Sequence, residues 1–294
     1  MLVKSLKNEG KNGFFYPICD SHLHLVQCED KESFFYGDFI SEPEHFSEAG
    51  KGGGGFDTEL TSGKLFSSGS YFCCTCVHSV SEWKKLEELK TGSAVVKKAF
   101  GFHPQKPDFE EEDALSFLEN LLETGKIDAI GEAGFDAFTP EYKENLSKQE
   151  KAFQIELELA EKYGKPLVIH ERKALDLIYR YAKPLSRLPS VLFHSFFYGH
   201  NEAESLLKKG INGYFSFGKQ ILNGNKKALD CAVNLPLERL LLETDAPYQT
   251  LKGENFTPIE DILKVYEKAL ELWNPSDKNE FFLQLKKNFS AVFG

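Results

Sequence analysis

The chain has 294 residues, of which 41% are hydrophobic and 27% charged, and its 26 phenylalanines supply enough apolar material for a globular core, which excludes a disordered chain. The formal net charge of −10 excludes a broad basic surface laid along nucleic acid, since that mode of binding needs clustered Lys and Arg side chains. A phosphate-bearing substrate would have to be held locally, by metal ions and a few basic residues in a pocket.

The sequence shows no basic stretch followed by a long apolar run and a small-residue cleavage site, and no apolar stretch of membrane-spanning length. We therefore expect a soluble cytoplasmic protein, and the sequence indicates no protein partner. Three of the six cysteines are crowded at Cys73, Cys74 and Cys76, which is not the pattern of a small disulfide-rich domain. We expect free, buried thiols.

Short β-rich runs alternate with amphipathic segments from about residue 70 onward, which is typical of repeated βα units around a parallel sheet. Eight strands with helices between them favour a TIM-type (β/α)₈ barrel over an open doubly wound sheet, with residues 1–294 as a single domain. The first expected strand ends at residue 20, and the other seven cover residues 71–77, 95–102, 129–131, 166–169, 191–193, 214–217 and 240–242.

Helical periodicity is clearest over residues 149–163, where Phe153, Leu157 and Ala160 recur at helical spacing and Gly164 supplies a stop. Residues 258–293 predict further helix on the outside of the barrel. Residues 29–68 differ, because they are rich in Gly, Ser and Glu and lack a clear apolar period. We expect a mobile βα loop there, either a flexible surface insertion or a lid over the site.

Imidazole and carboxylate side chains follow several of the expected strands. His22 and His24 lie two residues apart after the first strand, so in extended backbone they can face one ion, although this pair alone is equally consistent with two ordinary polar residues. The carboxyl ends of parallel barrel strands open onto one rim, where we expect the whole set to converge. The other members of the set are Glu132, His170, His194 and Asp245.

Six such ligands exceed what one tetrahedral ion needs, so the set predicts two divalent ions, such as Zn, Mg or Mn, that share a carboxylate. Two ions can hold an oxygen nucleophile, polarise a phosphoryl or carbonyl group and neutralise the developing charge. The residues alone therefore predict metal-assisted hydrolysis without specifying the bond.

Five motifs, in order along most of the chain, resemble those of the TatD-like deoxyribonucleases of the amidohydrolase superfamily. They are Asp-Ser-His-Leu-His-Leu at 20–25, Gly-Phe-His-Pro at 101–104, Ile-Gly-Glu-Ala-Gly-Phe-Asp at 130–136, His-Glu-Arg-Lys-Ala at 170–174 and Leu-Glu-Thr-Asp-Ala-Pro at 242–247. Asn288 and Phe293 also fall where the family's closing helix carries an Asn and a Phe, as a packing signature.

The resemblance implies two-metal hydrolysis of DNA phosphodiester bonds. It places His22 and His24 on the first ion and Glu132 between the two ions. His170 and His194 would hold the second ion, with Asp245 near the attacking water.

The sequence departs from the family pattern at two places. His-Ser-Phe-Phe-Tyr-Gly at 194–199 replaces the usual His-Cys-Phe-Ser-Gly, and Ala137-Phe138 stands where aromatic pairs are common. Together with the insertion at 29–68, these departures predict a substrate pocket of different shape.

Three further polar residues have two interpretations each, and a fourth has one. Glu243 shares a strand face with Asp245 and either holds water or a further ion, or is a buried positioning carboxylate. His103 either contacts a substrate phosphate or Glu132, or is an ordinary rim residue. Arg172 either clamps a phosphate or pairs with a neighbouring loop, and Asp20 could accept the proton of a ligand imidazole. We expect His45, His78 and His200 to be ordinary surface or loop residues.

The leading functional hypothesis is a phosphodiesterase that trims DNA from an end, with Asp245, Glu243 and His103 as catalytic residues and Arg172 and His103 contacting the substrate. A second hypothesis is a hydrolase of small amides, esters or phosphates. The third is a metal-binding partner module without catalysis, against which the complete ligand set argues.

Overall fold

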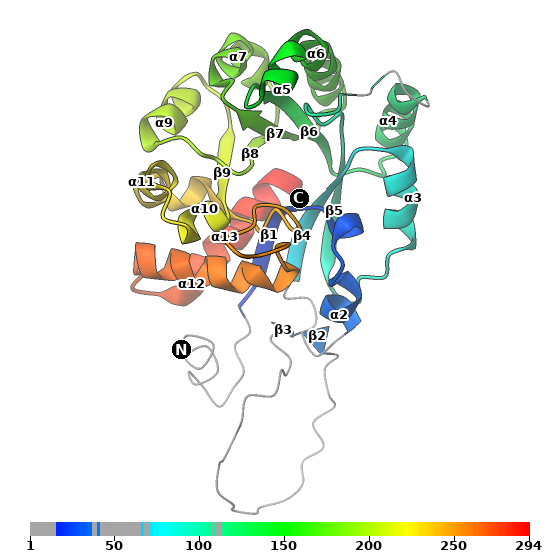
Figure 1. The fold of residues 1–294 in the computed structure, drawn as a ribbon. Helices are drawn as coiled ribbons and strands as arrows, with labels where there is room; N and C mark the ends of the chain where they lie inside the picture. The colour runs from blue at the N-terminus through cyan, green and yellow to red at the C-terminus, as the bar shows by residue number, and fades with distance from the viewer. Residues whose placement is uncertain (1–15, 37–39, 42–65, 68–70, 108, 110–112) are drawn as a thin grey trace, which may run out of the picture.

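The computed structural model describes residues 16–36, 40–41, 66–67, 71–107, 109 and 113–294. In this part of the chain, eight parallel strands follow one another around a nearly closed barrel, as expected (Figure 1). The barrel strands are β1 (Ile18–Leu23), β4 (Tyr71–Val77), β5 (Val95–Phe100), β6 (Ala129–Asp136), β7 (Leu167–Arg172), β8 (Val191–Phe193), β9 (Gly213–Phe217) and β10 (Leu240–Leu242).

Hydrogen bonds join β1 to the segment at the end of β10, where the first and last strands of the barrel meet. Ser21 Oγ donates to the carbonyl of Leu242 at 3.0 Å, and the backbone N–H of Asp245 donates to the carbonyl of His22 at 3.0 Å. The N–H of His24 reaches the carbonyl of Ala246 at 2.7 Å. These bonds bring two distant parts of the sequence, each with expected metal ligands, side by side.

Most helices pack around the outside of the barrel (Figure 1), whereas the last helix lies across one end of it. The periodic segment forms α6 with Gly164 as its left-handed C-cap, and residues 258–293 form two helices separated at Asn274. The helices are α2 (Lys31–Tyr36), α3 (Val80–Glu88), α4 (Ala114–Glu123), α5 (Pro140–Glu144), α6 (Leu146–Tyr163), α7 (Leu175–Arg180), α8 (Ala182–Leu185), α9 (His200–Lys208), α10 (Lys219–Leu222), α11 (Lys226–Asn234), α12 (Ile262–Trp273) and α13 (Lys278–Phe293), with short 3₁₀ turns at Leu25–Gln27, Leu237–Arg239 and Ile259–Asp261.

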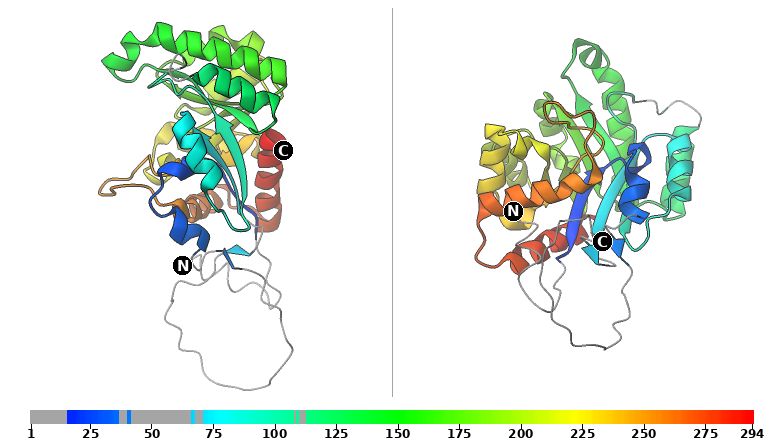
Figure 2. Two further views of the ribbon diagram at one scale, coloured as in Figure 1. Left: turned by 90° about the vertical axis from the view of Figure 1, so that its right-hand side faces the viewer. Right: turned by 60° about the horizontal axis from the view of Figure 1, so that its bottom comes forward.

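The amino-terminal end of the barrel is closed by α13. Phe289, Val292 and Phe293 pack in one cluster with the small inward-facing residues of the strands, among them Cys19 and Ala99. Asn288 Nδ2 donates to the carbonyls of Leu237 and Leu240, both at 2.7 Å, which fixes α13 against the start of β10. In the left view of Figure 2, α13 lies at one end of the barrel and the loop after β10 at the other.

Strand β6 is longer than expected, because it continues from Ala129 to Asp136 instead of ending at Gly131. Its register against β7 shifts between Ile130 and Ala133, and Gly131 there has φ +145°, where a Cβ would lie 2.7 Å from Val168 Cβ. Only glycine tolerates this backbone at this approach. Glu132 and His170 therefore lie within strands, and β5 ends at Phe100 instead of residue 102.

The expectation of a continuous loop over residues 29–68 was wrong at both ends of that range. Lys31–Tyr36 forms helix α2, whose Phe34 and Phe35 are buried, and Ile40–Ser41 (β2) pairs in parallel with Phe66–Ser67 (β3). Phe34 and Phe35 gave the missed apolar signal. The glycine run at 52–55 and the expected mobility concern residues outside the described ranges, as does His45.

All six cysteines are buried and free, as expected. Among the residues that the structure places, no helix combines the length and the apolar character needed to cross a bilayer.

Candidate metal centre

A cavity of about 780 Å³ opens at the carboxyl ends of the barrel strands. Its size falls within the roughly 300–1,000 Å³ typical of small-molecule sites. It is lined by ligand-type residues from most of the barrel strands or the loops that follow them: His24, His78, His103, Glu132, His170, His194 and Asp245. His22 lies buried directly beneath this lining.

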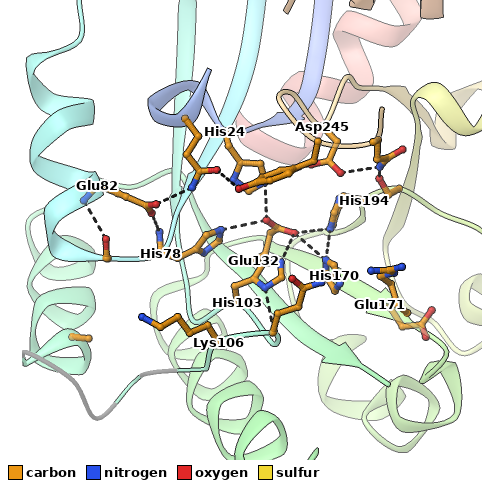
Figure 3. Close-up of a pocket in the computed structure, with 18 of the residues that line it drawn as sticks. His24, His78, Glu82, His103, Lys106, Glu132, His170, Glu171, His194 and Asp245 are labelled. Atoms are coloured by element: carbon orange, nitrogen blue, oxygen red, sulfur yellow. Dashed lines mark hydrogen bonds and ion pairs between the residues drawn. The ribbon is translucent and has the colours of Figure 1, made fainter. Parts of the chain in front are cut away.

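Glu132 is the centre of the arrangement, with imidazole rings on both of its carboxylate oxygens (Figure 3). Its Oε1 lies 3.4 Å from His22 Nε2, 3.2 Å from His24 Nε2 and 3.3 Å from His78 Nε2. Its Oε2 lies 2.7 Å from His194 Nε2, 3.2 Å from His170 Nδ1 and 3.5 Å from His103 Nε2. The single carboxylate thus separates two groups of imidazoles.

The first half of the centre comes from β1 and the segment after β10. Asp245 Oδ1 lies 3.5 Å from His22 Nε2 and 3.4 Å from His24 Nε2. The other ring nitrogen of His22, Nδ1, lies 3.5 Å from the thiol of Cys76. His24 Nδ1 has no hydrogen-bond partner in the described chain. The hydrogen bonds that hold these two imidazoles in place from behind, their outer support, are therefore weak.

The second half comes from β6, β7 and β8 and has a stronger outer support. Asp136 Oδ2 lies 3.2 Å from His170 Nε2, so the carboxylate accepts the Nε2 proton and leaves the Nδ1 lone pair for the cavity. Gln105 Nε2 donates to the same carboxylate at 2.9 Å. The buried Gln149 of α6 bonds both backbone groups of Asp136, at 2.8 and 3.0 Å. No role of Asp136 was predicted from the sequence.

The spacing of the donor atoms fits a divalent cation. Ligands at roughly 2.0–2.1 Å from a tetrahedral ion lie roughly 3.3–3.4 Å apart, which is close to the contacts of His22 and His24 with the two carboxylates. His22 Nε2 and Glu132 Oε1 are buried without a hydrogen bond from the described residues, although they are 3.4 Å apart. The two atoms are close but not hydrogen-bonded to each other. This is the arrangement expected of two ligand atoms that bind the same ion.

The pKa shifts of the clustered side chains also indicate that the site favours positive charge. Burial disfavours a charged imidazole, but the carboxylates outweigh burial and raise the pKa of His24 and His170 to about 9. Burial would raise the pKa of Glu132, yet the neighbouring His194 and His22 hold it well below its usual range. Buried carboxylates that stay ionised among imidazoles are suited to binding cations.

His103 and Arg172 lie where the sequence placed them, at the cavity. Burial lowers the pKa of His103 to about 3, so its ring is neutral. The Arg172 guanidinium lies 4.1 Å over the Phe138 ring and 3.6 Å from Asp136 Oδ2. Arg172 thus lines the cavity and pairs with Asp136, the last residue of β6, instead of with a loop, and its contact with a phosphate stays a prediction.

Glu243 is fully buried behind His194 instead of lining the cavity. It accepts hydrogen bonds from Ser195 N at 2.8 Å, from Ser195 Oγ at 2.5 Å and from Ser216 Oγ, and burial raises its pKa. Gln249 Nε2 donates to Ser195 Oγ and, at 2.9 Å, to Asp245 Oδ2. This chain of bonds favours the positioning interpretation of Glu243, whose catalytic role stays a prediction.

Two expectations about neighbouring residues were wrong. Asp20 does not hold a ligand imidazole, because its carboxylate accepts from Thr244 N at 3.0 Å and Thr244 Oγ1 at 2.7 Å across the barrel seam. His78 is not an ordinary loop residue, because it lines the cavity next to Glu132. It directly follows Val77, the last residue of β4, so the strand-end rule that found the other ligands also applied to it.

A sequence model of the TatD related DNase family matches residues 19–294. The chain belongs to this family. The resemblance seen in the motifs is thereby confirmed. An Edwardsiella piscicida protein named as a 3'-5' ssDNA/RNA exonuclease is 35% identical over 154 residues, which are 50% of this chain and 56% of that protein.

A Mycoplasma pneumoniae metal-dependent hydrolase is also 35% identical, over 52% of this chain and 61% of its own length. A human protein named as a 3'-5' RNA nuclease is 32% identical over 78% of this chain and 28% of its own length. The chain thus spans little more than half the length of the first two relatives.

Solved structures support the barrel fold. The YjjV protein of Escherichia coli, a TatD homologue, matches with a TM-score of 0.73 at 22% identity, over 95% of this chain and 99% of that one. A TatD family hydrolase of Entamoeba histolytica matches with a TM-score of 0.69 at 17% identity, over 95% and 98%. The chain therefore has the (β/α)₈ barrel fold of its TatD relatives, with a His, Glu and Asp cluster that could bind metal.

Proposed function

We propose that the protein hydrolyses phosphodiester bonds of single-stranded nucleic acid from an end, with two divalent ions in the cavity. The observation that carries this proposal is the convergence of His22, His24, Glu132, His170, His194 and Asp245 around one point. The single-domain organisation and the cytoplasmic location expected from the sequence stay predictions.

The ligands divide between the two ions as the geometry of the two halves suggests. His22, His24 and Asp245 would hold one ion, His170 and His194 the other, and Glu132 would contact both. When bound, such ions polarise the phosphoryl group and neutralise the negative charge that develops on it.

Three side chains of the cavity would act on the substrate itself. Arg172 is held by Phe138 and Asp136 and would present its remaining N–H groups to a phosphate oxygen. His103 Nδ1 accepts from Gln105 N at 3.1 Å, so Nε2 carries the ring proton and would turn it from Glu132 Oε2, 3.5 Å away, to a phosphate oxygen. Asp245, whose pKa is held well below its usual range by bonds from His22 and His24 against the effect of burial, would accept the proton of the attacking water.

The charge of the cavity supports attack at an end of the strand. Of the Lys and Arg side chains in the described chain, Lys106 and Arg172 line the cavity, beside the carboxylates of Glu82 and Glu171. Such a lining can grip one or two phosphates but gives no continuous basic track. The relatives named as 3'-5' exonucleases of ssDNA and RNA support the same substrate class.

The test is a parallel assay of the purified protein, reconstituted separately with Zn, Mn and Mg. Substrates are single-stranded DNA and RNA labelled at the 5' or the 3' end, duplex DNA and a circular single strand. We expect stepwise shortening of the linear single strands and no cleavage of the circle. Cleavage of the circle would contradict attack from an end.

A second candidate is hydrolysis of small phosphates or esters. The observation that favours it is the small number of cationic side chains lining the cavity, which is enough for one phosphate. Adding p-nitrophenyl phosphate and p-nitrophenyl acetate to the same assay separates the two. Turnover of these compounds with no activity on any oligonucleotide would replace the proposed function.

A further inference from the structure

His78 Nδ1 lies 3.1 Å from the carbonyl oxygen of Gly101. A carbonyl oxygen only accepts hydrogen bonds, so Nδ1 carries the ring proton and Nε2 of the neutral ring carries a lone pair. The backbone of His78 is also fixed, because its N–H donates to Glu82 Oε2 at 2.7 Å and Gln27 Nε2 donates to Glu82 Oε1 at 2.8 Å. The lone pair therefore has a set direction.

That lone pair faces a carboxylate oxygen. His78 Nε2 is buried, has no hydrogen-bond partner within the described ranges and lies 3.3 Å from Glu132 Oε1, which is equally without a donor. Two acceptor atoms at this distance repel each other unless a positive charge lies between or beside them. The arrangement thus calls for a cation at this side of Glu132.

His103, in the loop after the neighbouring strand β5, has the opposite tautomer. Its Nδ1 accepts from the backbone N–H of Gln105, so its Nε2 carries the proton and points toward Glu132 Oε2 as a donor. The two rings lie 5.1 Å apart between centroids. The backbone partners thus make one imidazole a donor and its neighbour a candidate ligand.

We propose that His78 is a ligand of a third divalent cation, held by His78 Nε2 and Glu132 Oε1 beside His24, which stays on the first ion. The ligand atoms of these three residues lie within 4.8 Å of one another. The inference rests on the proposed metal centre, because Glu132 belongs to both.

The charge of the cluster predicts how this position behaves. The carboxylates of Glu132, Asp245 and Asp136 contact its imidazoles, and two dications already outweigh their charge, so a third dication adds to an excess of positive charge. The third cation should therefore bind last and weakest, and inorganic phosphate should strengthen its binding by adding negative charge to the cavity.

The test is a titration of metal-stripped protein with Mn²⁺ by calorimetry and by electron paramagnetic resonance, with and without inorganic phosphate. We expect three binding steps in the unchanged protein. His78→Asn, which keeps a donor for the Gly101 carbonyl but lacks Nε2, should lose the weakest step or weaken it more than about 10-fold, while the other two steps stay. His200→Ala, on α9 and outside the cavity, is the matched control.

The outcomes separate this inference from the proposed function. If the unchanged protein binds two Mn²⁺ and the His78→Asn substitution leaves both unaltered, the third position is overturned and the two-metal proposal stands. If no Mn²⁺ binds at all, the proposed function fails first. Unchanged melting temperature of the metal-free variant shows that its fold is intact.

Histidine tautomers give a readout that does not depend on activity. In ¹⁵N NMR spectra of the metal-free protein at a pH where His78 is neutral, we expect the ring proton on Nδ1 of His78 and on Nε2 of His103. Diamagnetic Zn²⁺ should then shift the His78 Nε2 resonance in the unchanged protein. A proton on Nε2 of neutral His78 would overturn the assignment.

Discussion

Two buried glutamates in different regions of the barrel have opposite electrostatic surroundings. Glu132 on β6 is 1% exposed and lies among imidazoles, which hold its pKa well below the usual range against the effect of burial. Glu156 on α6, in the layer between helix and sheet, is 0% exposed, and burial raises its pKa well above the usual range. Its Oε1 accepts one bond, from Phe102 N at 2.7 Å, and its Oε2 has no partner in the described chain.

The difference shows that burial alone does not mark a functional carboxylate. An ionised carboxylate in a low-dielectric site is costly unless opposite charge surrounds it, and the cavity supplies such charge whereas the helix layer does not. Glu132 is thus suited to cations and Glu156 to a neutral, hydrogen-bonded state. Substitutions in the cavity should therefore change metal binding and turnover, whereas substitution of Glu156 should change stability.

The largest effect is expected for Glu132→Gln. The amide keeps the shape but removes the charge that both halves of the centre share, so each ion should bind more than about 100-fold more weakly and turnover should fall to that of metal-free protein. Metal content after dialysis and turnover on a single-stranded oligonucleotide measure the two effects. Normal metal content in this variant would remove Glu132 from its central position.

Asp245→Asn should separate catalysis from metal binding. Asn cannot accept the proton of the attacking water, so kcat should fall by about 10² to 10⁴-fold. Most of the metal should remain, because His22, His24 and Glu132 are unchanged. The same two measurements apply. Full turnover at normal metal content would pass the role of base to Glu243 or to the ions themselves.

Asp136→Asn and Cys76→Ala compare the outer supports of the two halves. Loss of the Asp136 charge behind His170 should weaken one ion about 10 to 100-fold. Sulfur is a weak acceptor, so losing Cys76 behind His22 should change affinity by less than about 5-fold. Competition with a chelating dye measures both affinities. Equal losses in the two variants would mean that the halves are supported alike.

Much of the fold could be predicted from the sequence because apolar strands, helical periodicity and the Gly164 stop are local signals. The six expected ligands also meet, since strand ends of a parallel barrel share one rim. What could not be predicted depends on backbone irregularity. The register shift at Gly131 carries Glu132 into the strand, and no periodicity reports it.

The outer partners of the site were harder to predict than the ligands themselves. The contact of Asp136 with His170 joins strands β6 and β7, and that of Gln249 with Asp245 forms within the segment after β10, so both depend on three-dimensional geometry that no sequence period indicates. Asp20 shows the same limit, since it bonds Thr244, 224 residues away in the chain. His78 is different, because its position at a strand end was visible in the sequence.

The smallest effect on turnover, with a measurable one on stability, is expected for Glu156→Gln. In the folded protein the raised pKa keeps Glu156 protonated at pH values where the unfolded chain, with a pKa of about 4.3, has released the proton. The stabilising contribution is therefore complete below that pH and is lost as the pH rises toward the folded pKa, by up to about 1.4 kcal/mol per pH unit. Gln does not titrate and keeps an oxygen for the Phe102 N–H.

The free energy of unfolding of Glu156→Gln should thus increase relative to the unchanged protein between about pH 4.5 and 7, with a constant difference below about pH 4. Urea denaturation of the metal-free proteins across this range measures it, and Glu158→Gln, at an exposed position of the same helix, is the control. A difference between the Glu156→Gln variant and the unchanged protein that does not change with pH would mean that Glu156 is ionised in the fold. Its environment would then resemble that of Glu132, and the contrast between the two regions would be lost.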